Sequence, residues 1–137
     1  MTDAPPPLTG VTPHLMIGGG RAAEAIDFYG QAFGATEANR VLAEDGKRLL
    51  HVHLNLAGGA LLLHDDFPEM TGGTPAPAPS GVVLHLEVPD ADVAWDQALA
   101  AGATVRFPIA NQFWGARYGQ LNDPFGHVWS IGGPAKE

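Results

Sequence analysis

Four histidines are the residues of this sequence best suited to chemistry. His14, His53, His64 and His85 lie within or at the end of short apolar stretches of the strand type. An imidazole acts as a general acid or base near neutral pH, and it also suits zinc, nickel or iron as a ligand. The same four side chains could equally line a pocket and make only hydrogen bonds. Glu87, two residues after His85, is the carboxylate expected on the same strand face.

A second candidate group lies near the C-terminus, where aromatic residues surround a cation. Trp114, Arg117 and Tyr118 belong to a stretch, 113–131, that also contains the sequence Asp-Pro-Phe-Gly at 123–126. This tetrapeptide is typical of a type I turn, so its flanks, 117–121 and 127–131, are predicted to pair as a hairpin. Aromatic and cationic side chains together are common both in ligand pockets and in packing, and the sequence leaves both interpretations open.

The composition excludes several classes of function. The chain has 137 residues, a hydrophobic content of 45% and no cysteine, which indicates one globular domain without disulfides or thiolate metal sites. A formal charge of −8 argues against nucleic acid and anionic membranes as partners. No apolar run is long enough for a membrane span, and the proline-rich start does not resemble a signal peptide, so we expect a cytoplasmic protein.

The spacing of apolar residues predicts two helices among eight strands. The helices are expected at 21–33 and 91–101, each followed by a glycine, Gly34 or Gly102, with Asp90 as N-cap of the second. In the strand at 49–56, we expect Leu50 and Val52 to share one face and Leu49 to lie on the other. The strands are expected at 11–17, 36–42, 49–56, 60–64, 81–88, 104–108, 117–121 and 127–131.

The two halves of the chain repeat each other. His14-Leu15-Met16-Ile17 corresponds to His85-Leu86-Glu87-Val88, and each predicted helix runs into Gly-Ala-Thr, at 34–36 and at 102–104. Each half continues into three further strands, so the chain is predicted to be α+β, with the order βαβββ twice. We expect a flexible arm at 1–10, one domain at 11–132 and a tail at 133–137. Within the domain, module one spans 11–66, a proline-rich linker 67–80 and module two 81–132.

A duplicated βαβββ unit resembles the vicinal oxygen chelate superfamily, which includes glyoxalase I, extradiol dioxygenases and bleomycin-resistance proteins. The chain looks most like the PhnB-like branch. The matching segments are Ala25-Ile26-Asp27-Phe28-Tyr29, Leu62-Leu63-His64-Asp65-Asp66-Phe67-Pro68-Glu69, Phe113-Trp114-Gly115-Ala116-Arg117-Tyr118-Gly119 and Asp123-Pro124-Phe125-Gly126-His127. The resemblance implies two modules that form a cupped mixed sheet, a small-molecule ligand and a homodimer, often with exchanged strands.

The resemblance also implies where a metal would bind in other members of the superfamily. The usual ligand positions fall near Thr12, Val83 and Ser130, and none of these residues is a strong metal ligand. We therefore expect no cofactor. If a divalent metal binds, its predicted ligands are His14, His85 and Glu87.

Two functions remain as hypotheses. The first is a glyoxalase-like protein that binds or acts on a small oxygenated or aromatic molecule, with His14 or His85 as general base. The second is a non-enzymatic drug-binding protein of the bleomycin-resistance type, in which the negative charge favours a cationic ligand. The expected ligand-binding residues are His14, His53, His64, Trp114, Arg117 and Tyr118.

Overall fold

The structure is a computed structural model, and it describes residues 8–137. Most of the arm predicted at 1–10 therefore lies outside the described residues. The chain divides into two compact units, one that ends at Pro77 and one that contains Ala78–Glu137 together with the last helical turn, Gln31–Phe33. We call these units module one and module two, and we describe the turn Gln31–Phe33 with the rest of its helix under module one. The boundary between them falls within the segment expected to link the repeats.

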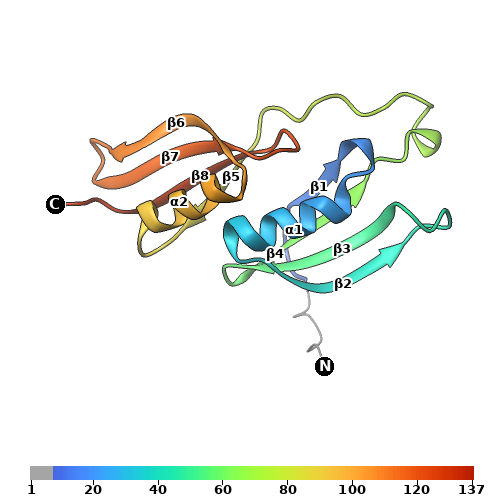
Figure 1. Ribbon diagram of the computed structural model, residues 1–137, viewed down its shortest axis with the longest axis horizontal. Helices are drawn as coiled ribbons and strands as arrows, with labels where there is room; N and C mark the ends of the chain where they lie inside the picture. The colour runs from blue at the N-terminus through green and yellow to red at the C-terminus, as the bar shows by residue number, and fades with distance from the viewer. Residues whose placement is uncertain (1–7) are drawn as a thin grey trace. The chain divides into compact units, whose positions relative to one another are not determined.

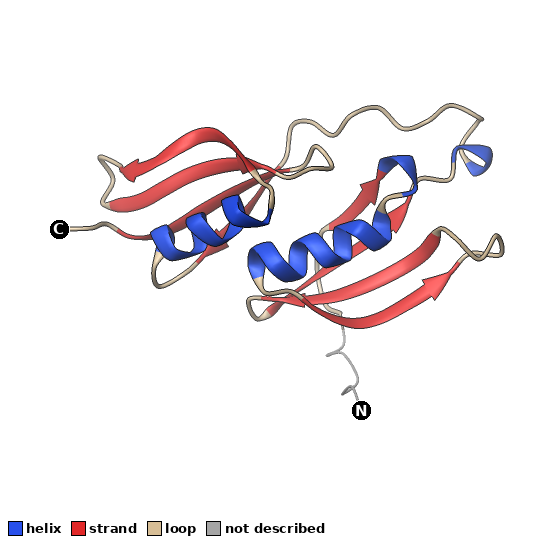
Figure 2. Ribbon diagram, in the orientation of Figure 1, coloured by secondary structure: helices blue, strands red, loops and turns tan. Residues whose placement is uncertain are grey.

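Module one contains a four-stranded mixed sheet and one long helix. The strand order is β1-β4-β3-β2, with β1 parallel to β4 and the other neighbours antiparallel. Helix α1 lies across one face of the sheet (Figures 1 and 2). The elements are β1 (His14–Ile17), α1 (Ala22–Phe33), β2 (Thr36–Leu42), β3 (Leu49–Leu56) and β4 (Gly59–Asp65).

Module two repeats this topology. Its strand order is β5-β8-β7-β6, with β5 parallel to β8, and α2 covers one face of the sheet (Figure 1). The elements are β5 (Val83–Glu87), α2 (Ala91–Ala101), β6 (Thr104–Asn111), β7 (Ala116–Asn122) and β8 (Val128–Pro134). The predicted α+β class and the doubled βαβββ order are confirmed.

Each helix begins and ends as its local sequence dictates. Gly34 adopts a left-handed conformation with φ of 75°, which terminates α1. The N-terminus of α1 is held by Asp65, whose Oδ1 accepts from the Ala22 amide at 2.9 Å, and whose Oδ2 accepts from the Leu49 amide at 2.7 Å. At α2, the Asp90 side chain accepts from the Val93 amide, which confirms the predicted N-cap.

The predicted strand faces are wrong at the start of β3. Val41 pairs with His51 and Leu42 with Leu49, so Leu50 has no partner and forms a β-bulge. Leu49 turns into the core with 1% of its surface exposed, and Leu50 turns out with 49% exposed. From Val52 onward the predicted alternation holds.

Some element boundaries differ from the prediction. β1 begins at His14 rather than Val11, and β6 continues past Pro108 to Asn111. Proline fits in β6 because this strand is at the sheet edge and needs no second hydrogen-bonding neighbour. β8 reaches Pro134, two residues into the segment expected to be a tail. The loop predicted at 67–80 contains a short 3-10 helix, Pro68–Met70.

The helices of residues 8–137 are all too short or too polar to cross a bilayer.

Candidate functional site

The sheet face of module two that points away from α2 gathers most of the candidate polar and aromatic residues. On β5, Leu86 is buried towards the core, so His85 and Glu87 lie on the opposite face. The register places Ser130 of β8 beside His85, because the two residues are Cα partners. Tyr118 of β7 pairs with Gly132 of β8, and Gln120 with Ser130. We call this surface, formed by His85, Glu87, Tyr118, Gln120 and Ser130, the open face of module two.

A hydrogen-bonded chain of three side chains crosses this face. Ser130 Oγ lies 2.7 Å from His85 Nδ1, and His85 Nε2 lies 2.8 Å from Glu87 Oε1. The Ser130 residue is only 2% exposed, whereas the side chains of His85 and Glu87 are 43% and 70% exposed. Both ring nitrogens of His85 are therefore engaged, one towards the interior and one towards solvent.

Aromatic rings lie next to these three hydrogen-bonded side chains. The Tyr118 ring lies nearly parallel to the His85 ring, at 16° and with 6.0 Å between centroids. Trp114 packs edge-on against Tyr118, with 5.8 Å between centroids. The Tyr118 hydroxyl accepts from Gln120 Nε2 at 3.1 Å, and Gln120 Oε1 accepts from Arg106 Nε at 3.1 Å. This arrangement places aromatic rings next to a histidine and a carboxylate.

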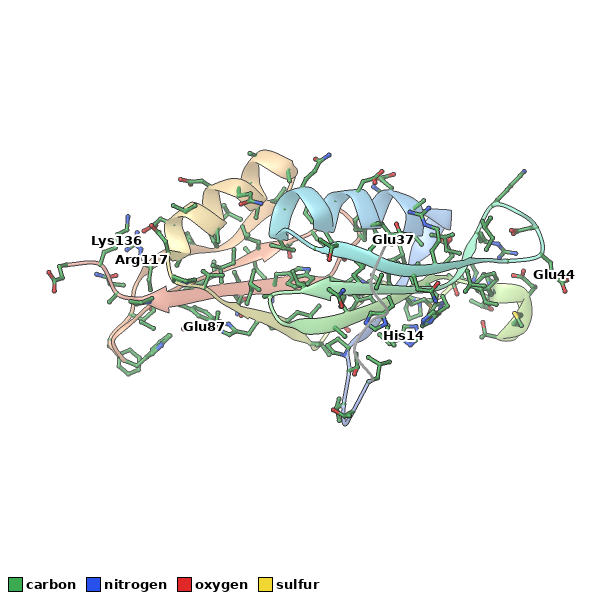
Figure 3. All side chains as sticks on the ribbon, turned by 90° about the horizontal axis from the view of Figure 1, so that it is seen from below. His14, Glu37, Glu44, Glu87, Arg117 and Lys136 are labelled. Carbon is green, nitrogen blue, oxygen red and sulfur yellow. The ribbon has the colours of Figure 1, made fainter. Side chains whose placement is uncertain are left out.

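Arg117 does not join Trp114 and Tyr118, although the sequence suggested that it would. It pairs with Gly133, on the face that carries α2, and its guanidinium contacts Asp92 of that helix at 3.1–3.2 Å. Lys136 Nζ also lies 2.7 Å from Asp92, and these contacts lower the pKa of Asp92, Lys136 contributing most and then Arg117. Figure 3 shows Arg117 and Lys136 together, on the side of the sheet away from Glu87. The ion pairs give Arg117 a structural role.

Module one has its own open face, which is rich in histidine. His14 of β1 projects away from α1 (Figure 3). Its ring meets the His64 ring at right angles, with 4.8 Å between centroids, and the His51 ring at 6.2 Å. Partial burial lowers the pKa of His14, and the neighbouring His64 and His51 lower it further. His51 was left out of the predicted binding set, although its spacing from His53 placed both on one strand face.

His53 is the most buried histidine of this group. It is 5% exposed, and its Nε2 has no hydrogen-bond partner within residues 8–137. His64 differs, because its Nδ1 lies 2.6 Å from the Asp65 carbonyl oxygen, which can only accept, so this nitrogen donates. We define His14, His51, His53 and His64 as the open face of module one.

The residues expected as metal ligands do not form a cluster of three within residues 8–137. A metal ligand needs a free nitrogen lone pair or a carboxylate, but both nitrogens of His85 are already hydrogen-bonded, and its nearest strand neighbour on β8 is the hydroxyl of Ser130. Across the described part of the chain, no group of three or more histidines or carboxylates has a geometry that could hold a metal ion. Of the three residues predicted as ligands of a possible metal, His85 and Glu87 lie in contact in module two, whereas His14 belongs to module one.

Comparison with known proteins identifies the family. The profile of the Glyoxalase/Bleomycin resistance protein/Dioxygenase superfamily matches residues 12–131. An uncharacterized protein of Mycobacterium bovis, Mb0911c, is 47% identical over 131 residues, which cover 93% of this chain and 84% of that protein.

Solved structures agree with this assignment. The Arabidopsis thaliana protein At5g48480 is 30% identical, with a TM-score of 0.71 over 90% of this chain and 98% of that one. A PhnB protein of Bacillus cereus shares the fold at 20% identity, with a TM-score of 0.70 over 90% of this chain and 98% of that one. The chain therefore belongs to the glyoxalase/bleomycin resistance protein/dioxygenase superfamily.

Proposed function

We propose that this protein binds a small oxygenated or aromatic molecule on the open face of module two and exchanges a proton with it, without a divalent metal. The observation that carries the proposal is the position of His85, held between Ser130 and Glu87 and beside the Tyr118 ring. Aromatic side chains beside a few convergent polar groups are the usual lining of a small-molecule site.

The proposal assigns a role to each group of residues at this face. Tyr118 and Trp114 provide ring surfaces on which a planar ligand can stack, a contact that contributes about 0.5–1.5 kcal/mol beyond the area it buries. His85 and Glu87 form an imidazole–carboxylate pair that can exchange a proton with a ligand oxygen.

A thermal-shift screen tests the proposal. The panel contains small phenols, hydroxy ketones and aromatic acids, and a compound that binds the native state raises the melting temperature. The shift produced by the best compound should fall strongly in Tyr118→Ala and remain in Val93→Ala, an exposed position on α2. Addition of Zn²⁺ or Ni²⁺ should leave the shift unchanged. Equal shifts in both variants, or a shift that requires the metal, would contradict the proposal.

A second candidate function is sequestration of a cationic aromatic drug without turnover. Phe113 and Trp114 are large and unusually exposed, at 98% and 54%, and the chain carries a formal charge of −8. If this function holds, the double change Phe113→Ala with Trp114→Ala should abolish binding of a cationic glycopeptide, while His85→Gln should leave it intact. If the proton-exchange function holds, His85→Gln should instead weaken binding of the compound found in the screen.

A further inference from the structure

We infer that Glu87 is the group that accepts a proton or hydrogen bond from the ligand, and that His85 and Ser130 are positioning residues behind it. This inference rests on the function proposed for the open face of module two. Sequence reasoning assigned the general base to a histidine and gave Glu87 a role only as a metal ligand. The structure supports a different role for each member of the chain.

The hydrogen-bonded series Ser130, His85 and Glu87 runs from the interior of the module to solvent. The exposed fraction rises from 2% at Ser130 to 43% at the His85 side chain and 70% at the Glu87 side chain. A ligand that approaches from solvent therefore reaches the Glu87 carboxylate first, whereas the Ser130 hydroxyl lies beneath the imidazole. The buried hydroxyl is unsuited to attack a ligand, and this burial excludes a serine nucleophile.

Hydrogen-bond chemistry fixes the proton positions. An ionised carboxylate only accepts hydrogen bonds, so the contact at 2.8 Å requires His85 Nε2–H to donate to Glu87 Oε1. In the neutral ring Nδ1 then carries the lone pair, and the hydroxyl of Ser130 must donate to it across 2.7 Å. With both nitrogens occupied, neutral His85 can take up a ligand proton only if the bond to Ser130 breaks.

Glu87 retains acceptor capacity. Only Oε1 takes part in the hydrogen bonds found among the described residues, which leaves Oε2 for a ligand. In the step we infer, a ligand O–H or N–H gives its proton to Oε2, and the electron pair of the broken bond stays on the ligand. The carboxyl group becomes neutral, and the proton later returns to the ligand or passes to water.

The backbone of β8 leaves room for this arrangement at Gly132. A Cβ atom built there would lie 2.8 Å from His85 Cε1 and 3.0 Å from Glu87 Oε1. Such distances are too short for a side chain, so the imidazole and the carboxylate lie directly over bare backbone. Gly132→Ala should displace both groups without removing either, which provides a variant independent of the polar residues themselves.

The ligand class follows from these contacts. Tyr118 offers a ring surface beside His85, and Glu87 offers a charged acceptor at the exposed end of the chain. A planar molecule with an O–H or N–H donor next to its ring satisfies both groups. A ligand that presents a carboxylate at this point would be repelled by Glu87.

Phenol and anisole provide the matched probes, because they share a ring and differ in the hydroxyl donor. Each is titrated into isotope-labelled protein and followed by NMR at the His85, Glu87 and Tyr118 resonances. Phenol should bind several-fold more tightly than anisole, by at most about tenfold for an exposed charged acceptor. This preference should vanish in Glu87→Met and in Gly132→Ala, and persist in the control Glu24→Met on α1. A preference that survives Glu87→Met would overturn the inference.

The outcomes of this titration distinguish a failure of the inference about Glu87 from a failure of the proposed function. If neither probe perturbs Tyr118 or His85, the proposed binding face is wrong and the inference fails with it. If both bind there with equal affinity, the face is right and only the role of Glu87 is wrong.

A ligand-free measurement tests the positioning role of Ser130. Nitrogen-15 spectra of the imidazoles, recorded where His85 is neutral, should show its proton on Nε2 and a hydrogen-bonded lone pair on Nδ1. Ser130→Ala should move the Nδ1 resonance downfield, because the donor is lost, and Ser130→Thr should restore it. A proton on Nδ1 in the wild-type protein would overturn the assigned order of donors.

Discussion

Asp123 is the residue on which the C-terminal hairpin depends most directly. It is buried, and its Oδ1 accepts from the amides of Phe125 and His127 at 2.9 and 3.0 Å. Its Oδ2 accepts from Trp129 Nε1 at 3.0 Å. One carboxylate thus closes the turn and ties it to an aromatic side chain of the module core.

We predict that Asp123→Ala lowers the free energy of unfolding by about 2–4 kcal/mol, because three donors lose a charged acceptor in a buried site. Urea denaturation measures the loss. Asp96→Ala, at an exposed position on α2, is the control and should change stability by less than about 0.5 kcal/mol. A loss for Asp123→Ala as small as that of the control would show that these bonds do not stabilise the hairpin.

His14 should make stability depend on pH. Its pKa in the folded protein lies below the usual histidine value of 6.5, so the unfolded chain takes up the proton first as the pH falls. The contribution is fully present above pH 6.5 and is lost as the pH falls through the lower folded pKa. Urea midpoints should therefore fall between about pH 7.5 and about pH 5.5, and His14→Gln should reduce that fall. An identical fall in the variant would contradict this prediction.

For single residues, the sequence predicted which strand face a side chain occupies better than which residues it contacts. The alternation of β5 correctly placed His85 and Glu87 on one face, because that rule needs only the strand period. Ser130 was singled out as a weak metal ligand, but its bond to His85 depends on the register between β5 and β8, which lie 45 residues apart in sequence. Arg117 was grouped with Tyr118 by proximity in sequence, yet neighbouring residues of a strand point to opposite faces.

At the scale of elements, α2 packs so closely on β7 that one position admits only glycine. A Cβ atom at Gly119 would lie 2.7 Å from the Trp95 ring and 2.8–2.9 Å from the backbone of Ile109. The backbone atoms cannot move without disturbing β6. The close contact therefore sets the distance between the helix and the sheet.

Gly119→Ala should consequently destabilise the protein by about 1–3 kcal/mol, the usual cost of inserting a methyl group into a packed core. Thermal unfolding followed by circular dichroism measures the effect. Gly115→Ala is not a suitable control, because φ is 92° at Gly115 and alanine would be strained there. The control is Ala100→Gly on the exposed side of α2, which should lower the free energy of unfolding by about 1 kcal/mol at most. If Gly119→Ala unfolds at the wild-type temperature, the close packing is not as rigid as the distances indicate.

Helices were easier to predict than strand details. The end of α1 at Gly34 and the N-cap Asp90 follow from local chemistry, and both were predicted from sequence. The bulge at Leu50 was not, because apolar residues occupy both 49 and 50 and the alternation rule has no signal for an extra residue. The extension of β6 beyond Pro108 to Asn111 was missed because proline disfavours strands except at sheet edges.

At the scale of the whole molecule, the internal repeat was the strongest signal in the sequence. Two similar segments, each followed by a helix and three strands, predicted two modules with the same order of elements, and the strand orders of the two observed sheets agree. The repeat predicts the order of helices and strands in each module. It does not predict which side chains bind a ligand, because the two modules carry different residues on their open faces.

We predict that the protein is a homodimer. Two of the four edge strands carry pairs of exposed apolar residues, Val41 and Leu42 on β2 and Val105 and Phe107 on β6. Such unprotected edges favour association with another chain. Light scattering at micromolar concentration should give twice the chain mass of 14.3 kDa. A mass equal to that of one chain would contradict the prediction.

The binding face of module two is tested most directly by a crystal structure with the best compound from the thermal-shift screen. We predict density for its ring against Tyr118, with a ligand oxygen or nitrogen within hydrogen-bonding distance of Glu87, and Ser130, His85 and Glu87 still joined in one chain. Density on the helix-covered side of the sheet, or only on the open face of module one, would contradict the proposed site.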